Sequence, residues 1–317
     1  MTETEPARAK VNLRLRVLDR RSDGFHEIET LFCELELADR VRVDVEPAGS
    51  TEVALEVLGP DLGPPESNLA WRAATAFLAA ARTPARVRVR LEKRIPLGAG
   101  LGGGSSDGAA TLRALDRLLP GRVTPTRLGG IAAELGSDMP FFLLPEPLAW
   151  GVARGERLTP LAGLEPRSVL LAIPAFPVST ADAYRWLDEQ RANSAAQGRE
   201  GQDADPASAR AGPDAVMLRA RGAEVRTWDD VIKLAMNDFE PVVYRKHPLL
   251  GRVRDTLARH GARPALLAGS GSTVFGVFDR ARDIQPACHA VARLEAGLRT
   301  VVTRTWNEVP REIGVDG

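Results

Sequence analysis

A run of glycines between residues 96 and 106, PLGAGLGGGSS, is the part of the sequence best suited to chemistry. Five glycines lie within the seven residues from Gly98 to Gly104, and glycine allows positive φ and close backbone approach. The run ends in two serines, Ser105 and Ser106, that open an amphipathic helical pattern. Backbone N–H groups at a helix N-terminus, together with the helix dipole, bind anions. The sequence therefore predicts a loop that holds the phosphates of a nucleotide, rather than a flexible glycine linker.

The loop matches neither of the two commonest phosphate-binding motifs. Gly98, Gly100 and Gly103 fit the dinucleotide pattern G-x-G-x-x-G, but the preceding segment ends in charged residues and no acidic strand end follows about 20 positions later. A Walker A loop needs lysine before its serine or threonine, and here Gly104 stands before Ser105. The loop therefore indicates a nucleotide-binding protein of another kind.

Three further residues have side chains that suit proton or phosphate chemistry, although position alone favours structural roles for them. Asp138 lies in GSDMP, just beyond an expected helix end, where an aspartate usually forms a turn or cap. Lys10 precedes a strand-like pattern, and a lysine there is usually solvated; it is nevertheless one of only four lysines among 42 basic residues. His26 follows the turn signal Asp23-Gly24, and a lone histidine is more often structural than a ligand.

The elements that would position these residues alternate between strands and helices in the N-terminal half. Period-two alternation predicts strands over 41–45 and 87–91. Helices are predicted over 67–82, with Ser67 or Asn68 as N-cap, over 105–119, and from Thr124-Pro125 to Gly136. These elements place the glycine loop directly after a strand and directly before a helix.

The C-terminal half repeats the mixture in another order. Strands are predicted over 169–173, 273–278 and 301–306, and helices from Ser179-Thr180 onward and over 248–260. This order is compatible with an α+β domain. Residues 189–224 are rich in Ala, Gly, Gln, Asp and Arg with almost no large apolar residues, which predicts a flexible surface insertion and leaves open a segment that binds a partner.

Composition narrows the class of protein. The 317 residues favour two domains, and a formal net charge of zero argues against a general polyanion binder but not against one local basic patch. Two cysteines in unlike contexts, Cys33 and Cys288, exclude a disulfide framework and indicate reduced thiols. The first ten residues are charged without a following apolar stretch, and no apolar run approaches a membrane span, so a cytoplasmic protein is expected.

The loop with its flanks, EKRIPLGAGLGGGSSDGAA, resembles the ATP-binding motif of the GHMP kinase superfamily. Four other segments, AKVNLRLRV, RSDGFHEIETLFCEL, LGSDMPFFL and NDFEPVV, resemble one family within it, the 4-diphosphocytidyl-2-C-methyl-D-erythritol kinases of the non-mevalonate isoprenoid pathway. The similarity runs from about Ala9 to Asn307 and is broken by the expected insertion.

The resemblance implies an α+β, two-domain GHMP kinase fold with the active site in the cleft between the domains. An N-terminal domain similar to domain 2 of ribosomal protein S5 would span residues 1–155, and a ferredoxin-like α+β domain would span residues 156–317. The implied reaction is ATP-dependent phosphorylation of the 2-hydroxyl of 4-diphosphocytidyl-2-C-methyl-D-erythritol (CDP-methylerythritol), giving the 2-phosphate and ADP. Mg²⁺ is expected with ATP, and Ser106 or Asp138 could contribute to binding it. The implied partner is a small molecule, not a nucleic acid or a membrane, and the choice between monomer and dimer stays open.

The same resemblance implies roles for individual residues. Lys10 and Asp138 would form the catalytic pair, with Asp138 accepting or orienting the proton of the acceptor hydroxyl. The expected ATP-binding residues are the loop, Lys93 just before it and Asn68: Pro96, Leu97, Gly98, Ala99, Gly100, Leu101, Gly102, Gly103, Gly104, Ser105, Ser106, Lys93 and Asn68. The expected substrate-binding residues are Asn12, Phe25, His26, Thr180 and Tyr184, with His26 reading the cytosine edge and Phe25 stacking on the base.

The chain departs from the family pattern in three places. Phe25 stands where tyrosine is commoner, which keeps a stacking face and loses a hydroxyl. Ala268 precedes the second glycine loop where serine is frequent, and Gly108 follows the ATP loop where alanine is usual. Two alternatives remain: another small-molecule GHMP kinase, which would lack DGFHEIETLF in this form, and a non-catalytic nucleotide-binding protein, which would lack Lys10 or Asp138.

Overall fold

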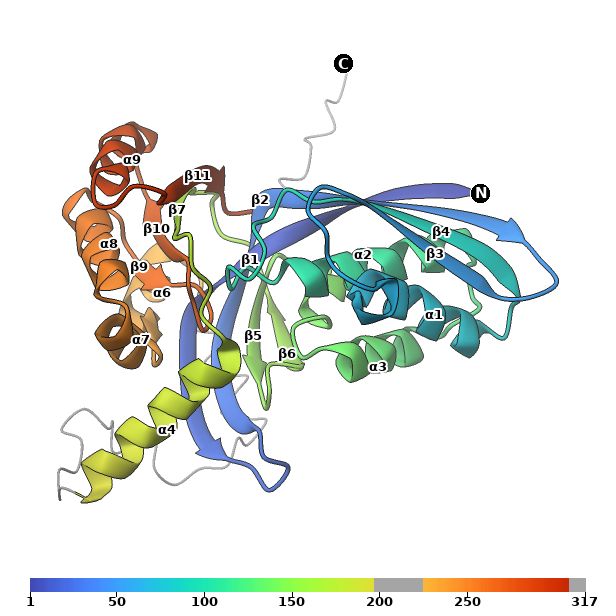
Figure 1. Ribbon diagram of the computed structural model, residues 1–317, viewed down its shortest axis with the longest axis horizontal. Helices are drawn as coiled ribbons and strands as arrows, with labels where there is room; N and C mark the ends of the chain where they lie inside the picture. The colour runs from blue at the N-terminus through green and yellow to red at the C-terminus, as the bar shows by residue number, and fades with distance from the viewer. Residues whose placement is uncertain (197–224, 308–317) are drawn as a thin grey trace, which may run out of the picture.

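The computed structural model of this chain describes residues 1–196 and 225–307. A seven-stranded sheet forms most of its N-terminal half, with strand order β3-β4-β2-β1-β8 and with β5 paired to β2 and β6 beyond it (Figure 1). The strands of this sheet are β1 (Thr2–Arg20), β2 (His26–Pro47), β3 (Glu52–Leu58), β4 (Ala85–Glu92), β5 (Leu148–Val152), β6 (Arg157–Leu161) and β8 (Met236–Asn237). The helices of this half are η1 (Pro65–Ser67), α1 (Leu69–Ala81), α2 (Gly103–Leu118), α3 (Pro125–Leu135) and η2 (Phe141–Leu143).

The strand pattern of this sheet follows from alternating side chains. Val41, Val43 and Val45 in β2 are buried in one core with apolar residues of α1, α2 and α3, while the residues between them are charged and face outward. The same alternation in β4 confirms the strands predicted over 41–45 and 87–91. Helix α1 begins where the side chain of Asn68 accepts a hydrogen bond from the backbone of Ala70, so the predicted N-cap is also confirmed.

A second sheet, order β11-β7-β10-β9, forms the C-terminal half, and all its pairings are antiparallel. Its strands are β7 (Ser168–Ile173), β9 (Ala265–Leu267), β10 (Val274–Phe278) and β11 (Arg299–Arg304). Helices α7, α8 and α9 gather beside this sheet in Figure 1. The helices of this half are α4 (Thr180–Ala196), α6 (Trp228–Leu234), α7 (Glu240–Lys246), α8 (Pro248–Arg259), η4 (Ala281–Asp283) and α9 (Ile284–Ala292).

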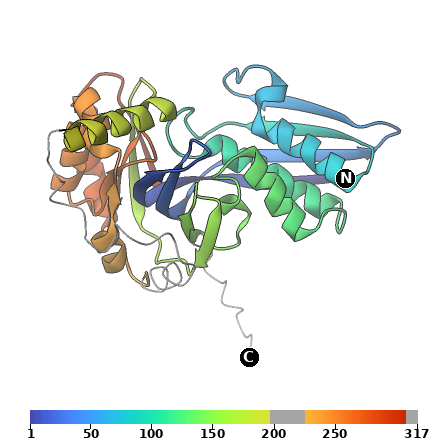
Figure 2. The ribbon, with the colours of Figure 1, turned by 90° about the horizontal axis from the view of Figure 1, so that it is seen from below.

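The long hairpin of β1 and β2 joins the two halves. It runs from the N-terminal sheet to the C-terminal elements, and both views place its far end between the two groups (Figures 1 and 2). Leu15, Val17 and Ile28, near its turn, are buried in one core with residues of β7, β10 and α8. Because the halves share this core, a site on the hairpin has its position fixed relative to both.

Two expectations about local structure need correction. Lys10 does not precede a strand but lies in the middle of β1, which is longer than its apolar pattern predicts because β2 pairs with it almost throughout. Helix α4 continues to Ala196, so residues 189–196 are helical and do not belong to a flexible insertion. Arg191 holds this part of α4 to the hairpin, donating to the carbonyl oxygens of Val17 and Leu18. The rest of the expected insertion lies outside the described residues.

Within residues 1–196 and 225–307, no helix combines the length and the apolar character needed to cross a membrane.

Candidate active site

The glycine loop connects the end of β4 to the first turn of α2 and lies against a second glycine-containing loop. Gly98, Gly100 and Gly102 all have positive φ, so the chain there needs a conformation that other residues avoid. At Gly100 an added Cβ would also collide with the carbonyl oxygen of Ala268 and lie 2.9 Å from that of Gly271. Glycine at position 100 therefore lets a loop of the N-terminal half touch a loop of the C-terminal half.

The second loop, residues 268–273, is held by a side chain from the NDFEPVV segment. The amide of Asn237, in β8, donates to the carbonyl oxygens of Leu267 at 2.8 Å and of Gly269 at 2.7 Å. The hydroxyl of Ser270 lies 2.9 Å from that of Thr180, at the start of α4. Thr180, one of the expected substrate ligands, thus lies where the second glycine loop meets α4.

A buried group of charges lies next to the start of the glycine loop. The Lys93 ammonium is bound by Asp39, at the middle of β2, and by Asp107, 2.6 Å away in the second turn of α2. Asp39 also accepts from the backbone N–H groups of Arg94 and Ile95. Burial raises the pKa of Asp107 to about 8, opposed by Lys93 and reinforced by Asp39.

This group changes how Lys93 can act. Lys93 lines the cavity beside the loop, but its ammonium is bound by two carboxylates, so its geometry suits holding the loop between β4 and α2 better than reaching a nucleotide. Sequence reasoning missed both carboxylates. Asp107 directly follows the loop and Asp39 ends a run of charged and apolar residues in β2, and neither context predicts burial.

The expected catalytic pair is brought together. Lys10 has only 5% of its side chain exposed, and its Nζ lies 3.2 Å from Oδ2 of Asp138, which is 28% exposed. Lys10 Nζ also donates to Asn12 Oδ1 at 2.8 Å. Asn12 in turn donates to the Thr30 hydroxyl at 2.7 Å, and that hydroxyl donates to the backbone. These hydrogen bonds turn the amide oxygen of Asn12 toward Lys10. The two side chains can meet because they lie two positions apart, on one face of the strand.

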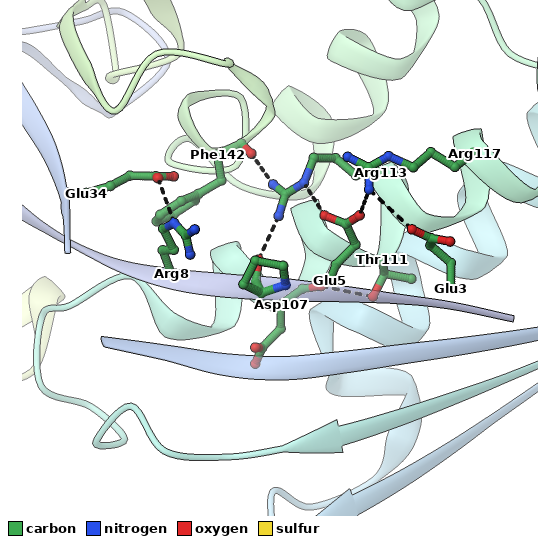
Figure 3. A network of polar contacts seen from close by, with 10 residues as sticks. Glu3, Glu5, Arg8, Glu34, Asp107, Thr111, Arg113, Arg117 and Phe142 are labelled. Atoms are coloured by element: carbon green, nitrogen blue, oxygen red, sulfur yellow. Dashed lines mark hydrogen bonds and ion pairs between the residues drawn. The ribbon is translucent and has the colours of Figure 1, made fainter. Parts of the chain in front are cut away.

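An arginine brace connects the segments that carry these two residues (Figure 3). Asp138 lies between α3 and η2. Arg113, in α2, donates to the carbonyl oxygen of Phe142 in η2 and, at 2.8 Å, to that of Pro6 in β1. It also pairs with the buried Glu5 of β1 at 3.0 Å. Arg113 therefore fixes the segment after Asp138 against the strand that carries Lys10, a function that no sequence motif revealed.

Gly108 has a local reason to differ from the usual alanine. An added Cβ there would lie 2.8 Å from Cε of Met139 and 3.2 Å from the carbonyl oxygen of Leu69. The glycine leaves room for Met139, the neighbour of Asp138, although glycine inside a helix is less favourable than alanine by about 1 kcal/mol.

Three adjoining cavities follow one another across the site. The first, about 270 Å³, is lined by Leu69, Lys93 and residues 95–105. The second, about 340 Å³, contains Lys10, Asn12 and Asp138. The third, about 840 Å³, is lined by aromatic and charged residues, among them Phe25, His26, Arg154, Tyr184 and Asp188. Gly100, Gly102 and Ser105 border the first and second cavities, and Arg154, Thr180 and Tyr184 border the second and third.

The third cavity has aromatic walls. The His26 ring stacks on the Tyr184 ring with centroids 4.9 Å apart, and Tyr184 packs edge-on against Phe239. Phe25 is 55% exposed, and the guanidinium of Arg154 lies 5.2 Å from its ring centroid. Burial and the nearby Asp138 carboxylate raise the pKa of Tyr184 to about 12, so its phenol stays neutral at ordinary pH.

Two of the expected ATP-binding residues, Asn68 and Ser106, line none of these three cavities. The Asn68 oxygen is occupied as the N-cap of α1. Ser106 is fully buried, and its hydroxyl has no hydrogen-bond partner among the described residues; the same holds for Oδ1 of Asp107. No group of three or more His, Cys, Asp or Glu side chains in residues 1–196 and 225–307 could hold a metal ion. The donors present fit a cation that is bound mainly by the phosphates of a ligand.

Together these features can hold a nucleotide phosphate at the first cavity, a hydroxyl at the second and a flat ring at the third. A carboxylate next to an ammonium suits deprotonation of a hydroxyl and stabilisation of transferred charge.

Comparison with known proteins agrees with this arrangement. The model of the GHMP kinases N terminal domain matches residues 68–146, and that of the GHMP kinases C terminal domain matches residues 220–295. The 4-diphosphocytidyl-2-C-methyl-D-erythritol kinase of Solibacter usitatus is 42% identical over 274 residues, covering 86% of this chain and 80% of its own length. The kinase of the same name from Anaeromyxobacter dehalogenans strain 2CP-C is 41% identical over 313 residues, covering 96% and 91%.

Solved structures show the same similarity in three dimensions. A crystal structure of 4-(cytidine 5'-diphospho)-2C-methyl-D-erythritol kinase has a TM-score of 0.69 and 38% identity, covering 96% of this chain and 100% of that one. Homoserine kinase from Cytophaga hutchinsonii shares the fold with a TM-score of 0.68 at 16% identity, covering 96% and 94%. The expected α+β, two-domain GHMP kinase fold is confirmed, and the boundary between residues 155 and 156 stays a prediction.

Proposed function

The chain belongs to the 4-diphosphocytidyl-2-C-methyl-D-erythritol kinase family, and we propose that it transfers the γ-phosphoryl group of ATP to the 2-hydroxyl of CDP-methylerythritol. The products are the 2-phosphate and ADP. The observation that best supports this function is the position of the Lys10–Asp138 pair, 3.2 Å apart, in the middle one of three adjoining cavities. A kinase that moves a phosphoryl group from ATP to a hydroxyl of a second nucleotide derivative needs three sites in that order: one for the phosphates of ATP, one for the reacting groups and one for the base of the acceptor.

The first cavity takes the phosphates of ATP. The first backbone N–H groups of a helix have no partner within the helix, so those of the first turn of α2 can bind a phosphate, and the helix dipole adds attraction. Lys93 supports the loop from below through Asp39 and Asp107. Mg²⁺ would accompany ATP and be bound mainly by its phosphate oxygens, and the Asp138 carboxylate and the Ser105 hydroxyl, which line the middle cavity, could supply protein oxygens to it.

The second cavity takes the acceptor hydroxyl. Asp138 accepts its proton or orients it, and Lys10 neutralises charge on the transferred group. Asn12 keeps the Lys10 ammonium in place through its 2.8 Å hydrogen bond. The small Gly102 lets Lys10 pass close to the loop, since an added Cβ would lie 3.0 Å from its Cγ. Transfer then needs no covalent intermediate with the protein.

The third cavity takes the cytidine. Phe25 and Tyr184 offer ring faces for the base, and His26 offers a polar edge. Arg154 borders both this cavity and the reaction cavity, which suits a cation that binds the diphosphate between the base and the acceptor hydroxyl. The unpaired cysteines Cys33 and Cys288 agree with a reducing compartment, so we place the reaction in the cytoplasm.

Product analysis tests this function. Purified protein is incubated with ATP, Mg²⁺ and CDP-methylerythritol, and phosphorus NMR follows the reaction. A new phosphate monoester signal that grows with the ADP signals, and that is about 100-fold slower to form with Asp138→Asn, supports the proposal. Asp116→Asn, in α2 and outside the residues that line the three cavities, is the matched control. ADP formation without a phosphorylated acceptor would contradict it.

A further inference from the structure

A carboxylate of the C-terminal half contacts His26 in the third cavity. Asp188, in α4, lies with its Oδ1 2.9 Å from Nε2 of His26. The histidine side chain is 7% exposed and the aspartate is 42% exposed. Both line the cavity of about 840 Å³. The contact joins residues 162 positions apart, from the hairpin and from the C-terminal half, so it forms only in the folded chain.

The contact decides which nitrogen of the ring can donate. An ionised carboxylate only accepts hydrogen bonds, so Nε2 of His26 must carry the proton. In the neutral ring the other nitrogen, Nδ1, is then an acceptor. Among the described residues Nδ1 makes no hydrogen bond, and stacking on Tyr184 holds the ring plane. The His26 ring, which lines the cavity, is therefore held in one plane with Nδ1 as its acceptor.

Cytosine and uracil differ at the group that such an acceptor reads. Cytosine carries an exocyclic amine, a donor, at position 4, whereas uracil carries a carbonyl oxygen, an acceptor. An acceptor nitrogen attracts the first and repels the second. The opposite tautomer, with the proton on Nδ1, would favour uracil instead.

We propose that Asp188 is a specificity-determining positioning residue, which fixes the tautomer of His26 so that Nδ1 accepts from the cytosine amine. The inference rests on the proposed function, because it needs the cytosine base in the third cavity. Asp188 touches no substrate in this account; it acts through His26. Without it the ring can carry its proton on either nitrogen, and the discrimination between the two bases weakens.

The tautomer can be measured without any substrate. Nitrogen-15 NMR of histidine-labelled protein separates protonated from unprotonated ring nitrogens. The chain has four histidines, and the His26→Ala variant identifies the signals of His26. The proposal predicts a protonated Nε2 and a bare Nδ1 in the wild type, and a mixture or reversal in Asp188→Ala. A matched control is Glu189→Ala, which removes the neighbouring, exposed carboxylate of α4 and should leave the tautomer unchanged.

Kinetics with two acceptors test the consequence. For CDP-methylerythritol, Asp188→Ala should raise KM about tenfold, as loss of one well-placed hydrogen bond does, with kcat and the KM for ATP nearly unchanged. The preference for CDP-methylerythritol over its uridine analogue should narrow by a similar factor, and Glu189→Ala should keep both values.

The outcomes distinguish a wrong role for Asp188 from a wrong role for His26. A bare Nε2 in the wild type, or a tautomer that Asp188→Ala does not alter, overturns the inference whatever the activity. If His26→Ala narrows the base preference and Asp188→Ala does not, the role of Asp188 is wrong and the role of His26 stands. If neither variant changes the base preference while Asp188→Ala shifts the tautomer, His26 does not read the base, and both the inference and that part of the proposed function fail.

Discussion

Lys10→Arg keeps the positive charge of the reaction cavity and changes its shape. The chain uses arginine at 38 of its 42 basic positions, so arginine would be an ordinary occupant if charge alone mattered. The surroundings of Lys10 leave little room. Its Nζ is held between Asn12 at 2.8 Å and Asp138 at 3.2 Å, and Gly102 lies so close that an added Cβ would sit 3.1 Å from its Cε.

The size of the effect follows from this packing. The planar, forked guanidinium is longer than an ammonium and tends to bind a carboxylate with two parallel hydrogen bonds. In a cavity where Lys10 is only 5% exposed, it must push Asp138 or the acceptor away by about 1 Å. A misplacement of that size costs on the order of 100-fold in rate, or about 2.7 kcal/mol in the barrier.

Steady-state kinetics on the folded Lys10→Arg variant measure this loss of rate. We expect kcat for CDP-methylerythritol to fall about 100-fold, with the circular dichroism spectrum and the affinity for an ATP analogue unchanged. Lys233→Arg is the matched control, because this lysine of α6 is 75% exposed and its ion pair with Asp230 is long, at 4.0 Å. If Lys10→Arg keeps more than half of the wild-type rate, Lys10 acts only as a distant charge and its catalytic role is refuted.

Three further predictions use other contacts of the site. Asp138→Asn should lower turnover about 100-fold with nearly unchanged binding of an ATP analogue, and near-normal turnover would show that Asp138 only forms a turn. Arg113→Met removes the donor of Oε2 of the buried Glu5 and of two carbonyl oxygens, while Arg117 still pairs with Oε1 of Glu5, so urea unfolding should show a loss of about 3 kcal/mol together with reduced turnover; Arg117→Met, at an exposed position, removes only the pair with Oε1 and should cost less than about 1 kcal/mol, and equal losses would argue against the brace. Burial raises the pKa of Glu34 from 4.5 to about 7, against the opposing effect of Arg8 and Arg113. The folded state thus keeps a proton that the unfolded state releases, and stability falls as pH rises between these values. Glu34→Gln should therefore stabilise the protein by about 2 kcal/mol more at pH 8 than at pH 5, and a difference independent of pH would contradict this reasoning.

The residues that could be found from the sequence are those whose surroundings are local in the chain. The glycine loop, the helix after it and the N-cap Asn68 depend on backbone preferences and on neighbours a few positions away. The two alternating strands follow from the same kind of short-range pattern. Lys10 and Asp138 have no such local signal, and only the resemblance to a family pointed to them before the structure placed them 3.2 Å apart.

The residues that were missed depend on contacts between distant parts of the chain. Asp39 meets Lys93 across 54 positions, Arg113 meets Glu5 across 108, and His26 meets Asp188 across 162. Asp39, Arg113 and Asp188 each look like an ordinary surface charge in their own segments, because one sequence carries no record of which charges face one another. The depth of burial of Lys10, which position alone assigned to solvent, was hidden for the same reason.

The choice of acceptor decides whether this protein is a CDP-methylerythritol kinase or another small-molecule kinase of the same superfamily. Purified protein with ATP and Mg²⁺ is offered CDP-methylerythritol, homoserine, mevalonate or galactose in turn, and release of ADP is followed with a coupled assay. The account predicts ADP release that depends on CDP-methylerythritol and stays at the background rate with the other three. Release with one of the other three and not with CDP-methylerythritol would contradict it.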